Sequence, residues 1–400
     1  MHADRFILAT AAFLLSVISG CAAEPGPRAV RLSVEWEAPV TVSAGGYGRV
    51  HRLLDGRLMC CYSRSGNDYV RFSSDEAATW SGETLAIESF DCTTEKGTAT
   101  LRCSNPEFTQ LSAEHPVHPG RIILAANLRP KDNQSTVHPF SIVCAVSDDG
   151  GATWSGRRNV YDSRTWDTDA AKGAWEPFVL ELPDGTVQVY FTDNTPYYAA
   201  GDQRGNNISV VESTDGGDSW GPERIVCHTE GGWDGMPVVT LVGGRLYLSV
   251  EHKDVRGGTV PMNVQLMSCT VEENWPEEIT LRSPRRVWPD TPSSAYEGAP
   301  YVIHTDHYFV VSCQSALGSE TPLKDTHAVP EVSVCPISEA VEGGKGQFTK
   351  MRVAPRPFDI DQTSDSGLWN SLCDLGGDTF LCVSQQKGRI VTAKGRIVKK

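Results

Sequence analysis

Two glutamates in this sequence have surroundings suited to acid/base chemistry. Glu176 stands between Trp175 and Pro177, and such an apolar setting disfavours the charged carboxylate and raises its pKa. Glu251 directly follows the apolar, strand-like run 246–250. Each glutamate is equally consistent with a solvated strand end, so their chemistry depends on whether the fold brings them together.

A repeated motif indicates which elements would position these glutamates. The form S-x-D-x-G-x-[TS]-W occurs at 147–154 and 213–220, and a third copy at 73–80 has Ala77 in place of glycine. Each copy follows a strand-like run. In such a turn the aspartate accepts backbone hydrogen bonds, glycine supplies a positive φ, and the tryptophan packs below the hairpin. The motif is similar to the Asp-box of sialidase-like β-propellers, and we expect it to be structural.

A second recurring unit joins two apolar strands through a short glycine turn. It occurs at 50–58, 178–187 and 238–248, and it predicts hairpins made by the inner strands of propeller blades. No long segment has the 3.6-residue helical period. The sequence therefore predicts an all-β protein, with residues 35–400 forming one six-bladed β-propeller of about 60 residues per blade.

The N-terminus has the pattern of an export signal. Arg5 precedes a short apolar run, and Ile18-Ser19-Gly20-Cys21 follows, which resembles a bacterial lipoprotein signal. We expect residues 1–21 to be the signal peptide, Cys21 to carry the lipid, and residues 22–34 to be a tether. The protein would then be an exported, membrane-anchored lipoprotein of the periplasm or cell surface. The alternative is an ordinary cleaved signal with an incidental cysteine.

Net charge narrows the classes of partner. The formal charge is −14, whereas nucleic acids and anionic membrane surfaces require a basic face. A neutral oligosaccharide or polysaccharide suits this charge better than an acidic one. We expect no nucleic-acid partner, membrane contact only through the N-terminal lipid, and a monomer.

Cysteine and histidine patterns do not predict a metal site or a cofactor. The twelve cysteines include no CxxC pair, and the ten histidines show no HxH or HExxH grouping. Cys92 and Cys103 flank a polar stretch and could form a disulfide in an oxidising compartment. Five others lie in apolar strand-like runs and are expected in the core: Cys60, Cys61, Cys144, Cys313 and Cys382.

A succession of short motifs resembles the exo-arabinanases of glycoside hydrolase family 93, within the sialidase-like superfamily. Each motif alone is weak, but their order and spacing span nearly all of the chain beyond the signal. They are Tyr47-Gly48-Arg49-Val50, Asn105-Pro106-Glu107, Asn127-Leu128-Arg129, Trp175-Glu176-Pro177, Gly201-Asp202-Gln203, Asp234-Gly235-Met236-Pro237, Glu251, Gly298-Ala299-Pro300-Tyr301-Val302 and Trp369-Asn370-Ser371-Leu372.

The resemblance implies a retaining displacement by two glutamates, with Glu176 as nucleophile and Glu251 as acid/base. Retention requires carboxyl groups about 5–5.5 Å apart, and their repulsion would keep one protonated. The resemblance also implies further sugar-binding residues, each of which has an alternative surface or core role. The candidates for hydroxyl contacts are Arg49, Arg129, Asn105, Asp202, Gln203 and Asp234, and those for a stacking platform are Trp233 and Tyr301.

Some features depart from the family pattern. Gly48 stands where a proline is often found, the first copy of the repeated motif has lost its glycine, and residues 315–365 contain stretches that do not align. Glu297 is a third acidic candidate that could replace Glu251 in the pair. The sugar and its linkage therefore stay open.

Two other functions are consistent with a propeller of this kind. An exo-α-sialidase needs an arginine triad, a tyrosine nucleophile and an acidic aspartate; Arg49 could be the first arginine and Asp68 the acid. However, the Arg-Ile-Pro element is absent, and no late tyrosine has an evident arginine partner. A non-catalytic carbohydrate-binding propeller would keep the turns and aromatic residues without needing two facing carboxylates.

Overall fold

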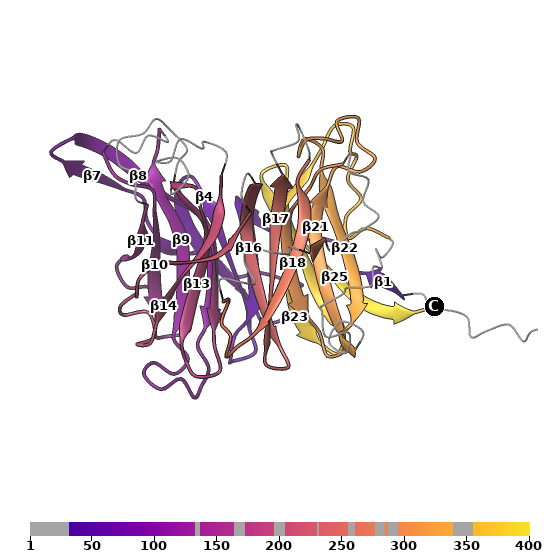
Figure 1. Ribbon diagram of the computed structural model, residues 1–400. Helices are drawn as coiled ribbons and strands as arrows, with labels where there is room; N and C mark the ends of the chain where they lie inside the picture. Colours follow the sequence, from indigo (N-terminus) through magenta and orange to yellow (C-terminus); the bar gives the residue numbers. More distant parts are fainter. Residues whose placement is uncertain are drawn as a thin grey trace, which may run out of the picture.

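The computed structural model describes residues 32–132, 137–163, 173–195, 205–229, 232–254, 261–276, 285–286, 295–338 and 355–400. Regular structure within these ranges is almost entirely β-strand, arranged in six antiparallel sheets. The sheets stand side by side as blades (Figure 1), and the inner strand of each blade contacts that of the next around a closed ring. The predicted six-bladed β-propeller is confirmed.

The first three blades follow one another along the chain. Blade one contains β3 (Gly46–Arg52), β4 (Leu58–Arg64), β5 (Asn67–Ser73) and β6 (Thr84–Ile87). Blade two contains β7 (Phe90–Thr94), β8 (Gly97–Gln110), β9 (Ile122–Pro130), β10 (Ser141–Ser147) and β11 (Arg158–Asp162). Blade three contains β12 (Ala174–Glu181), β13 (Val187–Asp193), β14 (Asn207–Ser213) and β15 (Arg224–His228).

The second half of the ring ends in a composite blade. Blade four contains β16 (Gly232–Val242), β17 (Arg245–Asp254), β18 (Asn263–Thr270) and β19 (Arg285–Arg286). Blade five contains β20 (Glu297–His304), β21 (Tyr308–Ser315) and β22 (Val329–Pro336). Blade six contains β23 (Gly367–Gly376), β24 (Thr379–Gln386) and β25 (Arg389–Lys399), and both β1 (Leu32–Trp36) and β2 (Val40–Ala44) pair with β25.

The pairing of β1 with β25 closes the ring and moves the expected domain boundary. Leu32 lies opposite Lys399, and Leu32 and Val34 are buried. The tether expected at 22–34 therefore ends before Leu32, because burial of these two side chains draws the segment into blade six. The N-terminal and C-terminal strands thus share one sheet, which fixes the last blade to the first.

Every inner strand contains a bulge at the same level of the ring. The register with the second strand shifts there in all six blades, and one residue adopts a left-handed backbone conformation, which costs about 1 kcal/mol for a non-glycine residue. Those residues, with φ between 46° and 58°, are Tyr47, Asn105, Glu176, Met236, Ala299 and Trp369. Each bulge turns one side chain out of the regular strand alternation.

The residue after the bulge explains one departure from the family pattern. In blades two to five this residue is a proline: Pro106, Pro177, Pro237 and Pro300. In blade one it is Gly48, where an added Cβ would lie 2.5 Å from Cγ2 of Ile390. The neighbouring composite blade crowds this position, so no larger side chain fits without movement.

A side chain from the preceding blade accepts a hydrogen bond from the bulge N–H in five blades. We call these five side chains the inter-blade acceptors. They are Ser63 for Asn105 (3.0 Å), Asn127 for Glu176 (2.8 Å), Thr192 for Met236 (3.0 Å), Glu251 for Ala299 (2.9 Å) and Gln314 for Trp369 (2.9 Å). They tie neighbouring blades together at the level of the bulges, and Glu251 is the only carboxylate among them.

The three repeated S-x-D-x-G-x-[TS]-W segments form the same turn. In the second copy, Asp149 accepts from the N–H and hydroxyl of Thr153, and the Ser147 hydroxyl accepts from the N–H of Gly151. The first copy keeps the equivalent bonds although Ala77 is held at φ 69°, close to the 87° of Gly151. The hydrogen bonds of the turn therefore impose a conformation that alanine disfavours.

The expected pairing of Cys92 with Cys103 is wrong. Both are thiols, and they lie on β7 and β8, opposite Ala99 and Leu128 respectively. The stretch that looked like a polar loop is a β-hairpin, so the register keeps the two sulfur atoms apart. The five cysteines expected in the core are all buried.

Candidate functional site

Glu176 is the residue at the bulge of β12. Its N–H donates to Oδ1 of Asn127, and the following Pro177 has no N–H to donate. The preceding Trp175 packs edge-on against Phe140, with 5.1 Å between the ring centroids. The bulge therefore turns the partly buried carboxyl of Glu176 away from the strand alternation, at the level of the other five bulge residues.

Glu251 lies on β17, opposite Gly235 of β16. Its Oε2 accepts the hydrogen bond from the Ala299 N–H in blade five. A Cβ added at Gly235 would lie 3.2 Å from Oε1, and one added at Gly298 would lie 2.7 Å from Oε2. Two glycines thus leave room for this carboxyl between blades four and five.

The two carboxyls interact electrostatically. Burial raises the pKa of Glu176, repulsion by Glu251 raises it further, and the positive charges of Arg49 and Arg129 oppose both effects. Burial also raises the pKa of Glu251, against the hydrogen bond from Ala299. Neighbouring carboxyls with raised pKa values retain a proton near neutral pH, so such a pair can supply one acid and one base.

Four other bulge residues give the centre of the ring an apolar lining. Tyr47, Met236 and Ala299 form a buried cluster against which Trp369 packs. The rings of Tyr47 and Trp369 lie 6.1 Å apart. Sequence reasoning missed Tyr47, Met236 and Trp369 as bulge residues; the recurring proline marks only Met236, because Gly48 follows Tyr47 and Asn370 follows Trp369.

The two arginines beside Glu176 differ in what their guanidinium groups contact. Arg49 is buried, donates to the carbonyl of Trp369 (3.0 Å), forms an ion pair with Glu107 (3.5 Å) and lies under the ring of Tyr47. These contacts hold the guanidinium inside the protein, where its charge lowers the pKa of Glu176; its expected contact with sugar hydroxyls stays a prediction. Arg129 is only partly buried and lies 5.1 Å from the ring of Trp175, which leaves it suitable for binding substrate.

Two of the predicted sugar-binding residues are committed to internal contacts. Asp234 is buried and accepts from His252 Nδ1 (2.7 Å) and from the N–H of Thr229 (2.8 Å). Tyr301 is 1% exposed, and its hydroxyl donates to Glu107 at 3.0 Å. Both side chains are buried with internal partners, and their expected contacts with a sugar stay predictions.

The remaining described candidates keep their access to the centre of the ring. Asn105 is the partly buried bulge residue of β8. The indole N–H of Trp233 donates to the Asn206 side-chain oxygen (3.0 Å), once that amide is oriented to accept it. An added Cβ at Gly235 would contact both Trp233 and Glu251, so the indole borders the carboxyl. Asp202, Gln203 and Cys21 lie outside the described residues.

The two alternative acids are both buried. Glu297 immediately precedes Gly298 on β20 and is 0% exposed, and successive strand residues face opposite ways. By this alternation its side chain points away from the space above Gly298 that Glu251 occupies, which favours Glu251 as the second carboxyl of the pair. Asp68 accepts from Ser63 at 2.7 Å, and burial raises its pKa to about 7. It supports the inter-blade acceptor of blade one.

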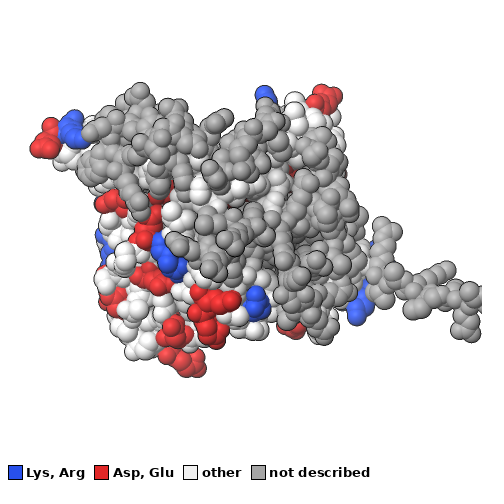
Figure 2. All heavy atoms as spheres, viewed as in Figure 1, with Lys and Arg blue, Asp and Glu red and all other residues white. Residues whose placement is uncertain are grey.

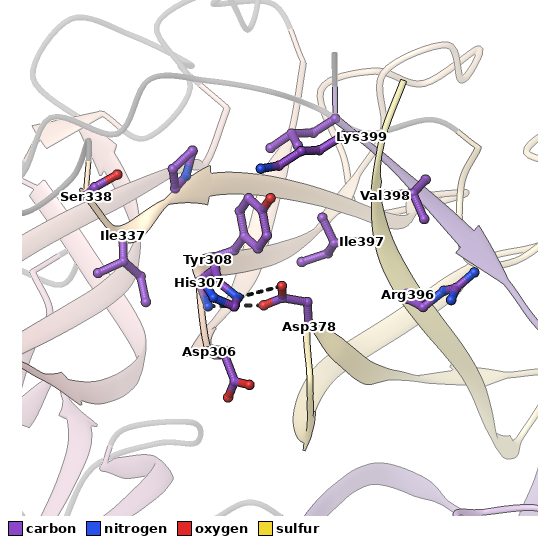
Figure 3. A pocket seen from close by; sticks show the side chains of 12 residues that line it. Asp306, His307, Tyr308, Ile337, Ser338, Asp378, Arg396, Ile397, Val398 and Lys399 are labelled. Carbon is purple, nitrogen blue, oxygen red and sulfur yellow. Dashed lines mark hydrogen bonds and ion pairs between the residues drawn. The ribbon is translucent and has the colours of Figure 1, made fainter. Parts of the chain in front are cut away.

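Other features of the described surface add no competing chemistry. Acidic side chains predominate on the face shown in Figure 2, in line with the negative net charge. A groove of about 900 Å³ lies between blades five and six (Figure 3), where His307 pairs with Asp378 at 2.8 Å.

Within the described ranges, no group of three His, Cys, Asp or Glu side chains is arranged to hold a metal ion. The same ranges contain no helix long and apolar enough to cross a membrane.

Comparison with known proteins identifies the fold. No family model matches the chain, and no curated protein does. A Penicillium chrysogenum α-L-arabinanase, solved with arabinobiose, has a TM-score of 0.64 at 18% identity over 90% of this chain and 98% of that one. The Fusarium graminearum α-L-arabinofuranosidase Arb93A, solved with an iminosugar inhibitor, has a TM-score of 0.64 at 17% identity over 90% and 97%.

Sialidases share the same architecture. The NanB sialidase of Streptococcus pneumoniae has a TM-score of 0.57 at 10% identity, over 90% of this chain and 70% of that one. The chain therefore has the sialidase-like β-propeller fold, and its chemistry has to be argued from its own residues.

Proposed function

We propose that the protein is an exo-acting glycoside hydrolase in which Glu176 and Glu251 remove terminal sugars, with arabinan-like oligosaccharides as the favoured substrates. The observation that carries the proposal is a pair of partly buried carboxyls with raised pKa values, one on the bulge of β12 and one on β17. Such a pair is the machinery that most glycoside hydrolases use.

The proposed reaction is a double displacement. The Glu176 carboxylate attacks the anomeric carbon while the Glu251 carboxyl protonates the leaving glycosidic oxygen, which gives a glycosyl–enzyme ester. Glu251 then removes a proton from water, and that water attacks the anomeric carbon and releases Glu176 with retained configuration. The first step needs an ionised Glu176; burial and repulsion by Glu251 raise the pKa of Glu176, and the charges of Arg49 and Arg129 offset only part of that rise.

A neutral furanose suits this site better than a sialic acid. A sialidase holds the substrate carboxylate with several free arginines, whereas Arg49 is engaged by Glu107 and a backbone carbonyl. The apolar lining of Tyr47, Met236 and Ala299 also favours an uncharged sugar ring. The solved arabinanase and arabinofuranosidase, which match over nearly their full lengths, support the same substrate class.

The test uses purified protein lacking residues 1–21, incubated with arabino-oligosaccharides and with sialyl conjugates, beside Glu176→Gln and Glu251→Gln. We expect arabinose or short arabino-oligosaccharides to be released only by the unsubstituted protein, with the anomeric configuration retained in the first NMR spectra. Release of sialic acid, or full activity in both variants, would overturn the proposal. Binding of arabino-oligosaccharides without hydrolysis would instead support the carbohydrate-binding alternative.

We further propose that the full-length chain is a lipoprotein anchored through Cys21. The short apolar run and the Ser19-Gly20-Cys21 sequence support this. Metabolic labelling with a radioactive fatty acid in a bacterial host should label the full-length protein but not Cys21→Ser. Equal labelling of both would contradict the proposal.

A further inference from the structure

Tyr296 is a partly buried residue beside the carboxyl pair that no motif pointed to. It immediately precedes β20. Its N–H donates to the carbonyl of Pro322 (2.6 Å), and its carbonyl accepts from the N–H of Ala316 (3.0 Å). Both partners lie between β21 and β22, so the backbone of Tyr296 is tied to the rest of blade five.

Gln314 determines which way the Tyr296 hydroxyl can donate. Oε1 of Gln314 accepts from the backbone N–H of Trp369. Because a backbone N–H can only donate, this bond fixes the orientation of the amide, and Nε2 is the atom that faces Tyr296. Nε2 donates to the phenolic oxygen at 2.8 Å. The phenolic oxygen is therefore an acceptor for Gln314, and its own hydrogen is available to another acceptor.

The carboxyl of Glu251 lies beside the Tyr296 hydroxyl at Gly298. A Cβ added at Gly298 would lie 2.3 Å from the Tyr296 hydroxyl and 2.7 Å from Oε2 of Glu251, so the two groups converge on one small space. Burial raises the pKa of Tyr296 well above its ordinary range, and the charge of Glu251 raises it further. The phenol therefore keeps its proton and can act as a donor.

We propose that Tyr296 is a positioning residue, whose hydroxyl donates to Glu251 and, together with the Ala299 N–H, holds that carboxyl turned toward Glu176. The inference rests on the proposed function and extends it to a residue on a third blade. It also gives Gly298 a role, because a side chain there would separate the phenol from the carboxyl. Tyr296 is a hydrogen-bond donor in this arrangement and not a nucleophile.

The test is the pH dependence of kcat/KM in Tyr296→Phe. A hydrogen bond to a carboxylate lowers its pKa, so loss of the phenol should raise that of Glu251 by about one unit and shift the alkaline limb upward. We expect kcat to fall about tenfold. Tyr62→Phe is the matched control, because Tyr62 is a buried tyrosine that donates to Glu83 in blade one; it should leave the pH profile unchanged.

A second measurement is independent of activity. NMR titration of ¹³C-labelled Glu251 in Glu176→Gln should give a pKa that rises by about one unit when Tyr296→Phe is added. An unchanged pH profile together with an unchanged Glu251 pKa would overturn the inference.

If the unsubstituted protein releases no sugar, the proposed function fails while the titration still decides the role of Tyr296. A fluorinated arabinofuranoside that labels Tyr296 instead of Glu176, seen by mass spectrometry, would also overturn it.

Discussion

The carboxyl groups of the repeated turns and those at the centre of the ring show opposite behaviour. Asp75 and Asp149 each accept hydrogen bonds from a backbone N–H and two hydroxyls, and these bonds lower the pKa of each to about 2. Glu176 and Glu251 are partly buried, and loss of water contact raises the pKa of each. The turns therefore hold their carboxylates in the charged form, whereas the two glutamates at the centre of the ring favour the protonated form, which the proposed chemistry uses.

A second contrast lies within the ring itself. Gln314 and Glu251 are both inter-blade acceptors, so an amide does in blade five what a carboxylate does in blade four. The carboxylate is therefore not required for joining the blades. The hydrogen bond between blades is therefore a structural role of Glu251 that is separate from its proposed acid/base role.

The largest expected effect is that of Glu176→Gln on turnover. An amide cannot form the glycosyl–enzyme ester, so kcat/KM should fall by about 10³-fold or more. Steady-state kinetics with an arabino-oligosaccharide measures this. The unfolding temperature of the variant should be at least that of the unsubstituted protein, which excludes misfolding as the cause.

Glu251→Gln should separate chemistry from blade packing. The amide oxygen can still accept from the Ala299 N–H, so stability should not fall, while kcat/KM falls by about 10²–10⁴-fold with loss of the acid/base. Glu251→Leu removes the acceptor too, and denaturant unfolding should show a loss of about 1–3 kcal/mol. Equal stability of the Gln and Leu variants would contradict the role as an inter-blade acceptor.

The carboxyl pair should also make the protein less stable as the pH rises. A carboxyl with a raised pKa binds its proton more tightly in the folded protein than in the unfolded chain, so its contribution to stability declines once the pH exceeds its ordinary value of 4.5. Glu176→Gln removes the part of this effect that Glu176 contributes. The variant should match the unsubstituted protein at about pH 4 and be more stable by about 1–2 kcal/mol at about pH 8. Thermal unfolding across that range is the measurement, and a difference that is constant with pH would contradict it.

Asp149→Ala should affect stability alone. It removes the acceptor for both groups of Thr153, and the unfolding temperature should fall by about 2–4 °C. Hydrolysis at a temperature well below unfolding should be unchanged. A large loss of kcat with intact folding would show that the turns and the centre of the ring are not independent.

Ala77→Gly should give the smallest effect. Glycine relieves the left-handed strain at φ 69°, but it also increases the entropy of the unfolded chain. The net gain should be about 0.5 kcal/mol in denaturant unfolding. Gly151→Ala is the reciprocal variant, and it should lose stability, because an added Cβ would lie 2.7 Å from Phe72.

The sequence by itself determined the blade architecture, because the signals for it are local. The three turn motifs and the strand–glycine–strand hairpins act over fewer than a dozen residues each, and the structure contains them where they were expected. Glu176 also had a local signal, since Trp175 and Pro177 are its neighbours in sequence. The ring closure was less visible, because Leu32 and Val34 pair with residues at the opposite end of the chain.

Only the tertiary structure decided the surroundings of the carboxyl pair. Arg49, Asp234 and Tyr301 looked like sugar contacts, but buried partners from distant segments occupy them. The carboxyl of Glu251 and the hydroxyl of Tyr296 both lie beside Gly298, between blades four and five. The physical reason is that burial and hydrogen-bond competition depend on long-range neighbours, whereas a sequence motif records only what lies beside a residue along the chain.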